Sequence, residues 1–271
     1  MIEVSVQVIN YNTKDYLRQS MVDIANDLTQ SGINYRICIL ENGSGDDLSG
    51  VETEYRDDSN VSFVFSPANL GFSRGHNLLA KQATGRTILV MNPDIRITQP
   101  RTVARLLDRM DEATDIKAVG PALLTPAGVI QSWDHGDFTW WSKSGFVWRE
   151  HNQPTDVAWI SGAMLLTDKK MFDDLCGFDP DFFLYGEDND FGMRVRQTGG
   201  RLVYDPTVEV MHYGSVTGVK YMYGKAAMDL FLRKHHPGVT GLILRAYNHI
   251  NYTKLLRRDI SRNLGIDSSK S

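Results

Sequence analysis

A carboxylate stands at the end of a buried-strand pattern, where Asn92-Pro93-Asp94 follows the apolar run 87–91. A carboxylate on a tight turn after a strand can hold a divalent cation through oxygen ligands. Such a cation bridges a diphosphate and neutralises the charge that grows on a leaving group. Asn, Pro and Asp are also common turn formers, so an ordinary turn is the competing interpretation.

A second group of carboxylates, Glu187, Asp188 and Asp190, follows an aromatic run that ends at Gly186. Acidic residues are common in a first helical turn because they complement the helix dipole. The apolar flank, however, predicts partly desolvated surroundings, which raise the proton affinity of a carboxylate. The pattern therefore also suits a general base.

Two further features can contact anions or metals. The segment 69–77 contains two glycines and Arg74 and leads into a helix, where backbone N–H groups and a guanidinium favour a phosphate. A plain loop-to-helix junction is the alternative. His212 ends a strand pattern and can be a metal ligand or a diphosphate contact, or merely a hydrogen-bonded side chain.

The elements that must position these residues follow from the hydrophobic pattern. Strands are predicted at 4–9, 35–40, 61–65 and 87–91, and helical patterns alternate with them, including 75–83 and 102–110. This alternation predicts an α/β fold with a mostly parallel, doubly wound sheet, in which ligands bind at the carboxyl ends of the strands. Asn10-Tyr11, Glu41-Asn42 and Asn92–Asp94 are therefore expected to face one cleft.

The second half has a different pattern. A Trp-rich stretch over 125–156 predicts a long loop, and strands are expected at 159–167, 201–204 and 208–211. Helices are expected at 169–175 and 187–198, and again from 218 to about 262 with a break near Pro237-Gly238.

Composition restricts the class of protein. The 271 residues are 42% hydrophobic and 23% charged, with a net charge of -4 and two cysteines. These values suit a globular domain and exclude a disulfide framework. No apolar run approaches a membrane span and the start has no signal-peptide pattern, so a cytoplasmic protein is expected.

Charge is unevenly distributed along the chain. Residues 219–271 hold 10 basic and 3 acidic residues, whereas residues 1–218 hold 19 basic and 30 acidic residues. We therefore divide the chain into a domain of 1–218 and a basic amphipathic helical extension of 219–271. The extension either meets an anionic membrane surface peripherally, packs on the acidic body or joins a second subunit; no nucleic-acid partner is expected.

The order of the motifs resembles the family 2 glycosyltransferases, and within them the bacterial rhamnosyltransferase-like group. The matching segments are 8–12, 41–44, 69–77, 92–94, 160–163, 177–190, Arg194 and 212–215. The resemblance covers about residues 4–218. It implies a GT-A fold, a nucleotide-sugar donor, Mn²⁺ or Mg²⁺, and inversion at the anomeric carbon. dTDP-rhamnose is the first candidate donor, followed by UDP-sugars, and the acceptor is a saccharide or lipid-linked saccharide in surface polysaccharide synthesis.

Roles follow by position from this resemblance. Asp188 is the implied catalytic base, Asp94 a metal ligand, and His212 a second ligand or phosphate contact. The implied donor-binding residues are Asn10, Tyr11, Asn12, Glu41, Asn69, Gly71, Arg74, Asn77, Asn92 and Asp94, and the acceptor-binding residues are Trp159, Gly162, Ala163, Glu187 and Trp140. Asn92 replaces the first acid of the Asp-x-Asp motif, and Glu41 replaces the usual Asp. The motif typical of processive members is absent, so non-processive transfer is expected.

Two other functions share some of these sequence features. A nucleotidyltransferase also has an α/β sheet and a metal carboxylate, but it should show a Gly-rich basic loop after the first strand, where this chain has Asn10-Tyr11-Asn12-Thr13. A non-catalytic carbohydrate-binding protein could use the Trp residues between 133 and 159 as a stacking surface, but it would not need Asp94 and Asp188 together.

Overall fold

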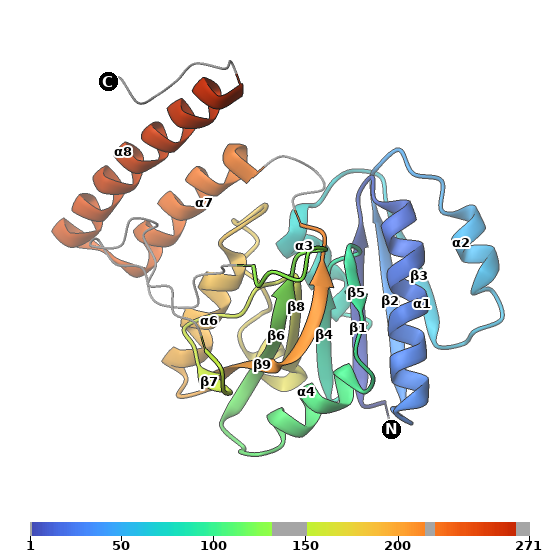
Figure 1. The fold of residues 1–271 in the computed structure, drawn as a ribbon. Helices are drawn as coiled ribbons and strands as arrows, with labels where there is room; N and C mark the ends of the chain where they lie inside the picture. The colour runs from blue at the N-terminus through green and yellow to red at the C-terminus, as the bar shows by residue number, and fades with distance from the viewer. Residues whose placement is uncertain (1, 132–150, 215–219, 264–271) are drawn as a thin grey trace.

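The computed structural model describes residues 2–131, 151–214 and 220–263, with side chains left undescribed in 220–222 and 251–263. Its first half alternates strands and helices (Figure 1). These elements are β1 (Val4–Asn10), α1 (Lys14–Gln30), β2 (Tyr35–Asn42), α2 (Ser49–Glu54), β3 (Val61–Ser66), α3 (Gly71–Ala80) and β4 (Thr87–Met91). Strands β1 to β4 pair in parallel, as the sequence predicts.

The second half completes a mixed sheet. Its elements are β5 (Ile95–Ile97), α4 (Thr102–Met110), β6 (Ile116–Leu124), β7 (Thr155–Asp156), β8 (Met164–Asp168), α5 (Lys169–Asp174), α6 (Glu187–Gln197) and β9 (Arg201–His212). The strand order is β3-β2-β1-β4-β8-β6-β9-β5, and β7 pairs with β9. Because β8 runs antiparallel to both β4 and β6, only the first half of the sheet is fully parallel.

Two strand predictions differ from the structure. The residues 201–211 form one strand, because Asp205-Pro206-Thr207 makes an irregularity in the pairing with β6 and does not end the strand. The predicted strand 159–167 begins only at Met164. Residues 159–163 form a buried turn, in which Met164 N–H donates to the Ser161 carbonyl at 3.3 Å.

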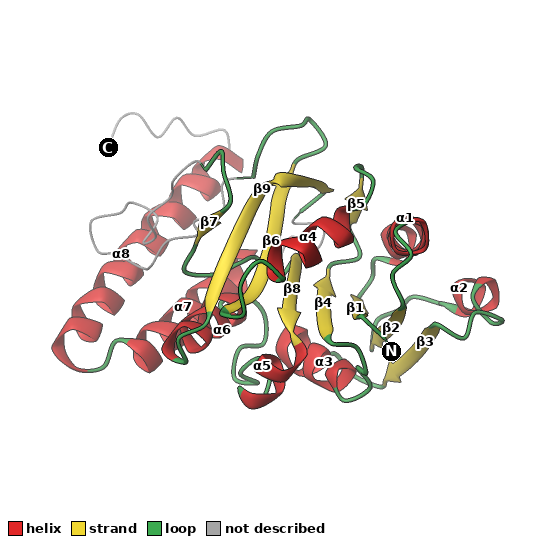
Figure 2. Ribbon diagram, turned by 90° about the horizontal axis from the view of Figure 1, so that it is seen from below, coloured by secondary structure: helices red, strands yellow, loops and turns green. Residues whose placement is uncertain are grey.

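Helices cover both faces of the sheet (Figure 2). α1 and α4 lie on one face, and the alternate residues Val4, Val6 and Val8 of β1 join their core. α3, α5 and α6 lie on the other face, where Phe172, Phe178 and Phe191 are at most 1% exposed. The central strands are therefore buried on both sides, which makes their carboxyl ends rigid positions for polar side chains.

The predicted tail helices are α7 (Lys220–His235) and α8 (Gly238–Asn263), with the break at the predicted place. They lie side by side at one end of the molecule (Figure 1). α7 packs on the domain through Ala227, Phe231 and Leu232, which share a buried cluster with Phe182. The boundary at 218/219 stays a prediction. No helix among the described residues has the length and apolar character needed to cross a membrane.

Candidate active site

Asn10 and Glu41 meet at the carboxyl ends of β1 and β2. The two residues pair across the strands, and Asn10 Nδ2 donates to Glu41 Oε2 at 2.5 Å and to Asp46 Oδ2 at 3.0 Å. The other Glu41 oxygen accepts from Ser44 N–H at 2.7 Å. Asn10 is fully buried and Glu41 is 7% exposed. The structure thus brings together two residues that the sequence placed only on neighbouring strand ends.

Asp46 is a member of this group that sequence reasoning missed. Its Oδ2 also accepts from Lys14 N–H at 3.0 Å, so Asp46 caps the first turn of α1 from a distant loop. The Thr13 hydroxyl instead donates to Asn10 Oδ1 at 3.0 Å. The role of Asp46 has no local signature, because two adjacent acids in a polar loop are usually solvated.

Tyr11 and Asn12 follow directly on the loop after β1. Tyr11 is 37% exposed, so its ring is accessible from solvent. Asn12 has a φ of 57°, a left-handed conformation, and its Oδ1 accepts from Gly45 N–H at 3.2 Å. This bond ties the loop after β1 to the loop after β2, so both loops bound the same polar region.

The start of α3 already has protein acceptors. Leu70 N–H donates to Asn42 Oδ1, Gly71 N–H to Asn69 Oδ1, and Phe72 N–H to the Phe183 carbonyl. A phosphate there would have to displace these acceptors, which weakens the predicted anion site. The other predicted contacts of this segment are also engaged: Arg74 Nε donates to the Pro180 carbonyl, and Asn77 exchanges two hydrogen bonds with the Phe178 backbone. Their donor-binding roles stay predictions.

Asp94 and His212 meet because β5 pairs with the end of β9. Ile95 lies opposite His212 in the register, which places Asp94 Oδ1 3.5 Å from His212 Nε2. Asp94 Oδ2 accepts from Gly214 N–H at 2.9 Å, and the Asp94 carbonyl accepts from Tyr213 N–H. Asp94 is 6% exposed and His212 is 3% exposed. The two predicted metal ligands are 118 positions apart in the chain, and the pairing of β5 with β9 brings them together.

Gln131 fixes the orientation of the His212 ring. The Gln131 amide N–H donates to the His212 carbonyl at 2.7 Å, so its Oε1 faces His212 Nδ1 at 2.8 Å. Since an amide oxygen only accepts, Nδ1 is the donor in this contact, and Nε2 is the ring nitrogen that faces Asp94. Metal-binding histidines are commonly held in this way by an acceptor on the second nitrogen.

The Asp94–His212 pair fits a divalent cation. A carboxylate oxygen and an imidazole nitrogen converge in a nearly buried place, and both groups can be ligands of a divalent cation. No three His, Cys, Asp or Glu side chains converge to hold a metal within the ranges that the structure describes. Within those ranges Asp94 and His212 are the side chains that could hold such a cation, and Mg²⁺ at nucleotide sites usually takes further oxygen ligands from phosphate and water.

Asp188 lies in the first turn of α6 and is connected to the Asp94 turn through residues 162–163. Asp188 Oδ2 accepts from Gly162 N–H at 3.2 Å, and the Ala163 carbonyl accepts from Asn92 N–H at 2.8 Å. A Cβ at Gly162 would lie 2.8 Å from the Phe72 ring, so a larger residue here would have to displace that ring. The acidic helix start and the Asn-Pro-Asp turn, 94 positions apart in the chain, thus contact the same short segment.

The three acids of this helix start differ in ionisation. Burial raises the pKa of Asp188 to about 6, although backbone N–H donors from Gly162 and Asn189 oppose the rise. Burial and the neighbouring Asp188 charge raise the pKa of Glu187 further above its usual range, and Glu187 Oε2 is buried without a hydrogen-bond partner. Burial would also raise the pKa of Asp190, but His235, Lys234 and Arg194 lower it to about 2. The pKa of Asp188 therefore lies close enough to neutrality for proton exchange, whereas Asp190 stays ionised.

The predicted acceptor residues lie in different surroundings. Gly162, Ala163 and Glu187 lie in or beside the segment that contacts Asp188. Trp159 is 6% exposed and packs against Gly192 of α6, which favours a role in packing over an open stacking surface. Trp140, like Trp133, Trp141 and Trp148, falls outside the described residues.

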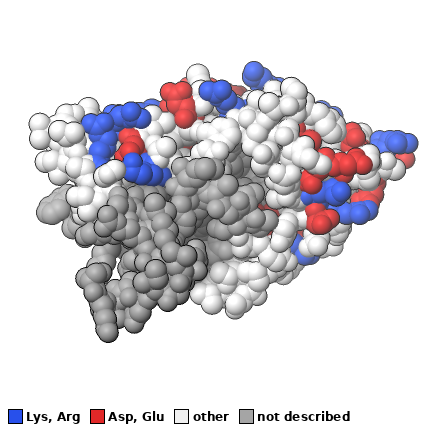
Figure 3. All heavy atoms as spheres, turned by 90° about the horizontal axis from the view of Figure 1, so that it is seen from above, with Lys and Arg blue, Asp and Glu red and all other residues white. Residues whose placement is uncertain are grey.

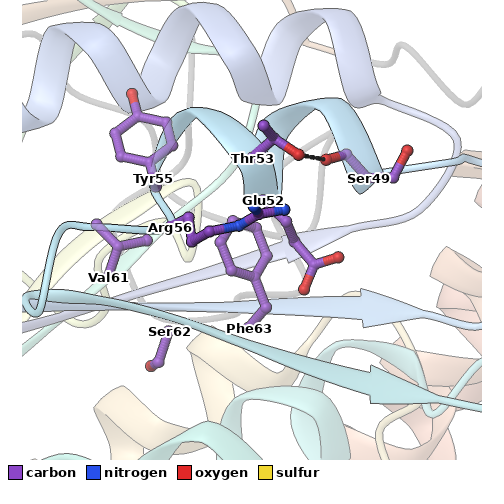
Figure 4. Close-up of a pocket in the computed structure, with 8 residues that line it drawn as sticks. All are labelled: Ser49, Glu52, Thr53, Tyr55, Arg56, Val61, Ser62 and Phe63. Carbon is purple, nitrogen blue, oxygen red and sulfur yellow. Dashed lines mark hydrogen bonds between the residues drawn. The ribbon is translucent and has the colours of Figure 1, made fainter.

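One surface hollow lies elsewhere. It has a volume of about 360 Å³ and is lined by α2 and β3 residues (Figure 4). They are Ser49, Glu52, Thr53, Tyr55, Arg56, Val61, Ser62 and Phe63. Since β3 is the edge strand, three strands separate it from β8, and the hollow takes no part in the candidate site.

Solved structures that are similar to this fold include GT-A glycosyltransferases. A GalNAc-T7 structure with UDP, GalNAc and Mn²⁺ matches with a TM-score of 0.65 and 15% identity, over 97% of this chain and 58% of that one. A Pyrobaculum calidifontis mannosyltransferase in complex with GDP-Man and Mn²⁺ matches with a TM-score of 0.65 and 12% identity, over 97% and 80%. At these identities the likeness establishes the fold, and it confirms the predicted GT-A class.

Residues 5–176 match the model of glycosyl transferase family 2, so the chain belongs to that family. A Mycobacterium tuberculosis N-acetylglucosaminyl-diphospho-decaprenol L-rhamnosyltransferase is 27% identical over 207 residues, 65% of this chain and 66% of the relative. The chain thus spans just under two thirds of that relative's length. A low-salt glycan biosynthesis hexosyltransferase of Haloferax volcanii is 20% identical over 265 residues, 93% of this chain and 80% of the relative. The predicted family is confirmed.

Proposed function

We propose that the chain is an inverting, non-processive glycosyltransferase that moves a sugar from a nucleotide-diphosphate donor to a saccharide or lipid-linked saccharide. One observation carries the proposal: Asp188, with a pKa near neutral, and the Asp94–His212 pair are joined through the segment 162–163. A base and a phosphate-neutralising site on either side of one segment are the two parts that a single displacement needs.

Each group has a distinct task in the reaction. Asp188 accepts the proton of the acceptor hydroxyl while that oxygen forms a bond to the anomeric carbon and the bond from this carbon to the diphosphate breaks. The transition state resembles an oxocarbenium ion, as in glycoside hydrolysis. Asp94 and His212 would hold Mn²⁺ or Mg²⁺, which supplies positive charge against the diphosphate when bound. The nucleoside diphosphate leaves, and the configuration at the anomeric carbon is inverted.

The donor occupies the strand ends on the β1–β2 side in this proposal. The Glu41 carboxylate, held by Asn10 and Ser44, takes the position where the family reads a pyrimidine base, and Tyr11 is available to stack on the nucleoside. dTDP-rhamnose is the first donor to test, because the M. tuberculosis relative is named an L-rhamnosyltransferase. UDP-sugars, including UDP-galactofuranose, are tested next.

The pH dependence of turnover follows from the pKa of Asp188. A base works in its ionised form, and with a pKa of about 6 roughly nine tenths of the carboxylate is ionised at pH 7. We expect kcat to fall about tenfold per pH unit below pH 6 and to be level from about pH 7 to 8. A kcat profile in a donor-saturated assay measures this, and a profile that is flat down to pH 5 contradicts Asp188 as the base.

A lipid-linked acceptor would lie at a membrane surface, and α8 has an apolar side that faces solvent and could contact such a surface. Val239 is 75% exposed, Leu242 and Ile243 are 60% exposed, and Ile250 is 52% exposed, whereas Leu244 on the opposite side is 4% exposed. The helix has five Lys or Arg residues and one Asp. Figure 3 shows basic, acidic and uncharged side chains together on the described part of the end where α7 and α8 lie. We propose that this side of α8 binds an anionic membrane surface peripherally.

Co-sedimentation with vesicles containing anionic lipid tests this proposal. We expect salt-sensitive binding at low ionic strength, and severalfold weaker binding of Leu242→Asn/Ile243→Asn, because apolar area and charge both contribute. Val22→Asn, an exposed apolar position on α1, is the matched control and should bind like the parent. Absence of binding at low salt, or equal binding of both variants, excludes membrane docking by α8.

A further inference from the structure

The basic end of α7 reaches back to the helix that holds the candidate base. Lys234 Nζ and His235 Nε2 each lie 2.7 Å from Asp190 Oδ1, and Arg194 Nε lies 2.7 Å from Asp190 Oδ2. Asp190 is fully buried and two positions after Asp188 on the same first turn of α6. We call Asp190, Arg194, Lys234 and His235 the Asp190 cluster.

The Asp190 cluster also fixes the loop that precedes α6. Lys234 Nζ lies 2.5 Å from Asp179 Oδ2, and the Arg194 guanidinium donates to the carbonyls of Leu175 and Gly177 at 2.9 and 2.8 Å. Each oxygen of the Asp190 carboxylate therefore has a cationic or imidazole partner, and these partners hold the segment 175–179 to both helices. A fully paired buried carboxylate has little freedom to move, since an unpaired one would be strongly unfavourable.

A second set of contacts joins α7 to the turn between that loop and α6. Gly186 has a φ of 84°, and a Cβ built on it would lie 3.3 Å from the Ala227 Cβ of α7. Phe182 packs in the cluster with Ala227, Phe231 and Leu232, and the Phe183 ring lies 5.2 Å from the Tyr223 ring. α7 thus contacts residues on both sides of Glu187 and Asp188: the turn 182–186 before them and Asp190 after them.

We propose that α7 is a positioning element of the active site, in which Lys234 and His235 hold Asp188 at its working position through Asp190. These two residues touch no reacting atom; they act by fixing the first turn of α6. This inference rests on the proposed function, since it concerns the base of that reaction. In this inference α7, the first helix of the basic extension, supports catalysis by positioning the base.

The test compares Lys234→Ala/His235→Ala with Lys225→Ala in the full chain. Lys225 is also a lysine of α7 with an acidic partner, Asp229, but it lies outside the Asp190 cluster. We expect the double variant to lose kcat by about 10- to 100-fold, as small displacements of catalytic groups do, with the dissociation constant for nucleoside diphosphate and Mn²⁺ unchanged. Lys225→Ala should keep the parent kcat.

Conservative variants separate positioning from stability alone. His235→Gln keeps an N–H donor and Lys234→Arg keeps a cation, so both should recover most of the kcat lost in the alanine variants, each assayed well below its own Tm. A parent kcat in the folded double variant overturns the inference, and so does a loss that the conservative variants do not recover. If the double variant does not fold, kcat is compared between the single variants His235→Ala and His235→Gln, and the same outcomes decide. A parent chain that transfers no sugar contradicts the proposed function instead.

Discussion

Asp188→Asn should lower the rate of sugar transfer by about 10²- to 10⁴-fold, the usual contribution of a general base. The asparagine side chain keeps the shape of the carboxyl group but cannot accept the proton of the acceptor hydroxyl. Its oxygen can still accept from Gly162 N–H, which donates to Asp188 at 3.2 Å, so the local structure should persist. Steady-state kinetics with saturating donor give the rate, and calorimetry with nucleoside diphosphate should show unchanged binding.

Asp174→Asn is the matched control for this substitution. Asp174 is an exposed carboxylate on α5 that pairs with Lys170, so its loss should leave transfer unchanged. Near-parent transfer by Asp188→Asn would refute its role as the base. Glu187 would then be the next candidate, whereas Asp190 is already occupied by its three partners.

Asp94→Ala should remove metal-dependent binding of the donor and reduce transfer to background. Asp94 Oδ1 and His212 Nε2 are the two protein groups that converge at the proposed metal position, and loss of one leaves a single ligand. Titration of nucleoside diphosphate with and without Mn²⁺ measures the effect. We expect the gain in affinity that Mn²⁺ gives the parent to be lost in the variant.

Two further variants make this result specific. Asp94→Asn keeps an acceptor for Gly214 N–H, which bonds to Asp94 at 2.9 Å, and it should still lose most of the metal effect because an amide oxygen is a weaker ligand. Asp111→Ala, an exposed partner of Arg86, should behave like the parent. If Asp94→Ala binds nucleoside diphosphate and Mn²⁺ as tightly as the parent, the metal role of Asp94 is wrong.

The parallel half of the fold was predictable because its signals are local. The four strands of the first half and the helix 102–110 appear where the apolar patterns place them. α3 begins at Gly71, earlier than the predicted 75, because Asn42, Asn69 and Phe183 supply acceptors for its first N–H groups. Acceptors from distant segments cannot be predicted from the hydrophobic pattern around residue 71.

The candidate site was predictable in part for the same reason. Asn10, Glu41, Asp94, His212 and Asp188 were found because they stand at strand ends or helix starts. Asp46, Gln131 and the pairing of Lys234 and His235 with Asp190 were not, because each depends on contacts between segments that only the fold brings together. The partner of a polar loop residue cannot be predicted from hydrophobic periodicity, because loops have no periodic pattern.

Metal-dependent sugar transfer is tested most directly by the release of nucleoside diphosphate from candidate nucleotide sugars, measured by mass spectrometry with Mn²⁺ and with a chelator. The screen begins with dTDP-rhamnose and continues with UDP-sugars, with and without saccharide acceptors, for the parent and Asp94→Ala. We expect at least one donor to yield nucleoside diphosphate with Mn²⁺, and the chelator or the substitution to abolish the release. The proposed function is contradicted by equal release with and without metal, by cleavage to a nucleoside monophosphate, or by no turnover of any donor.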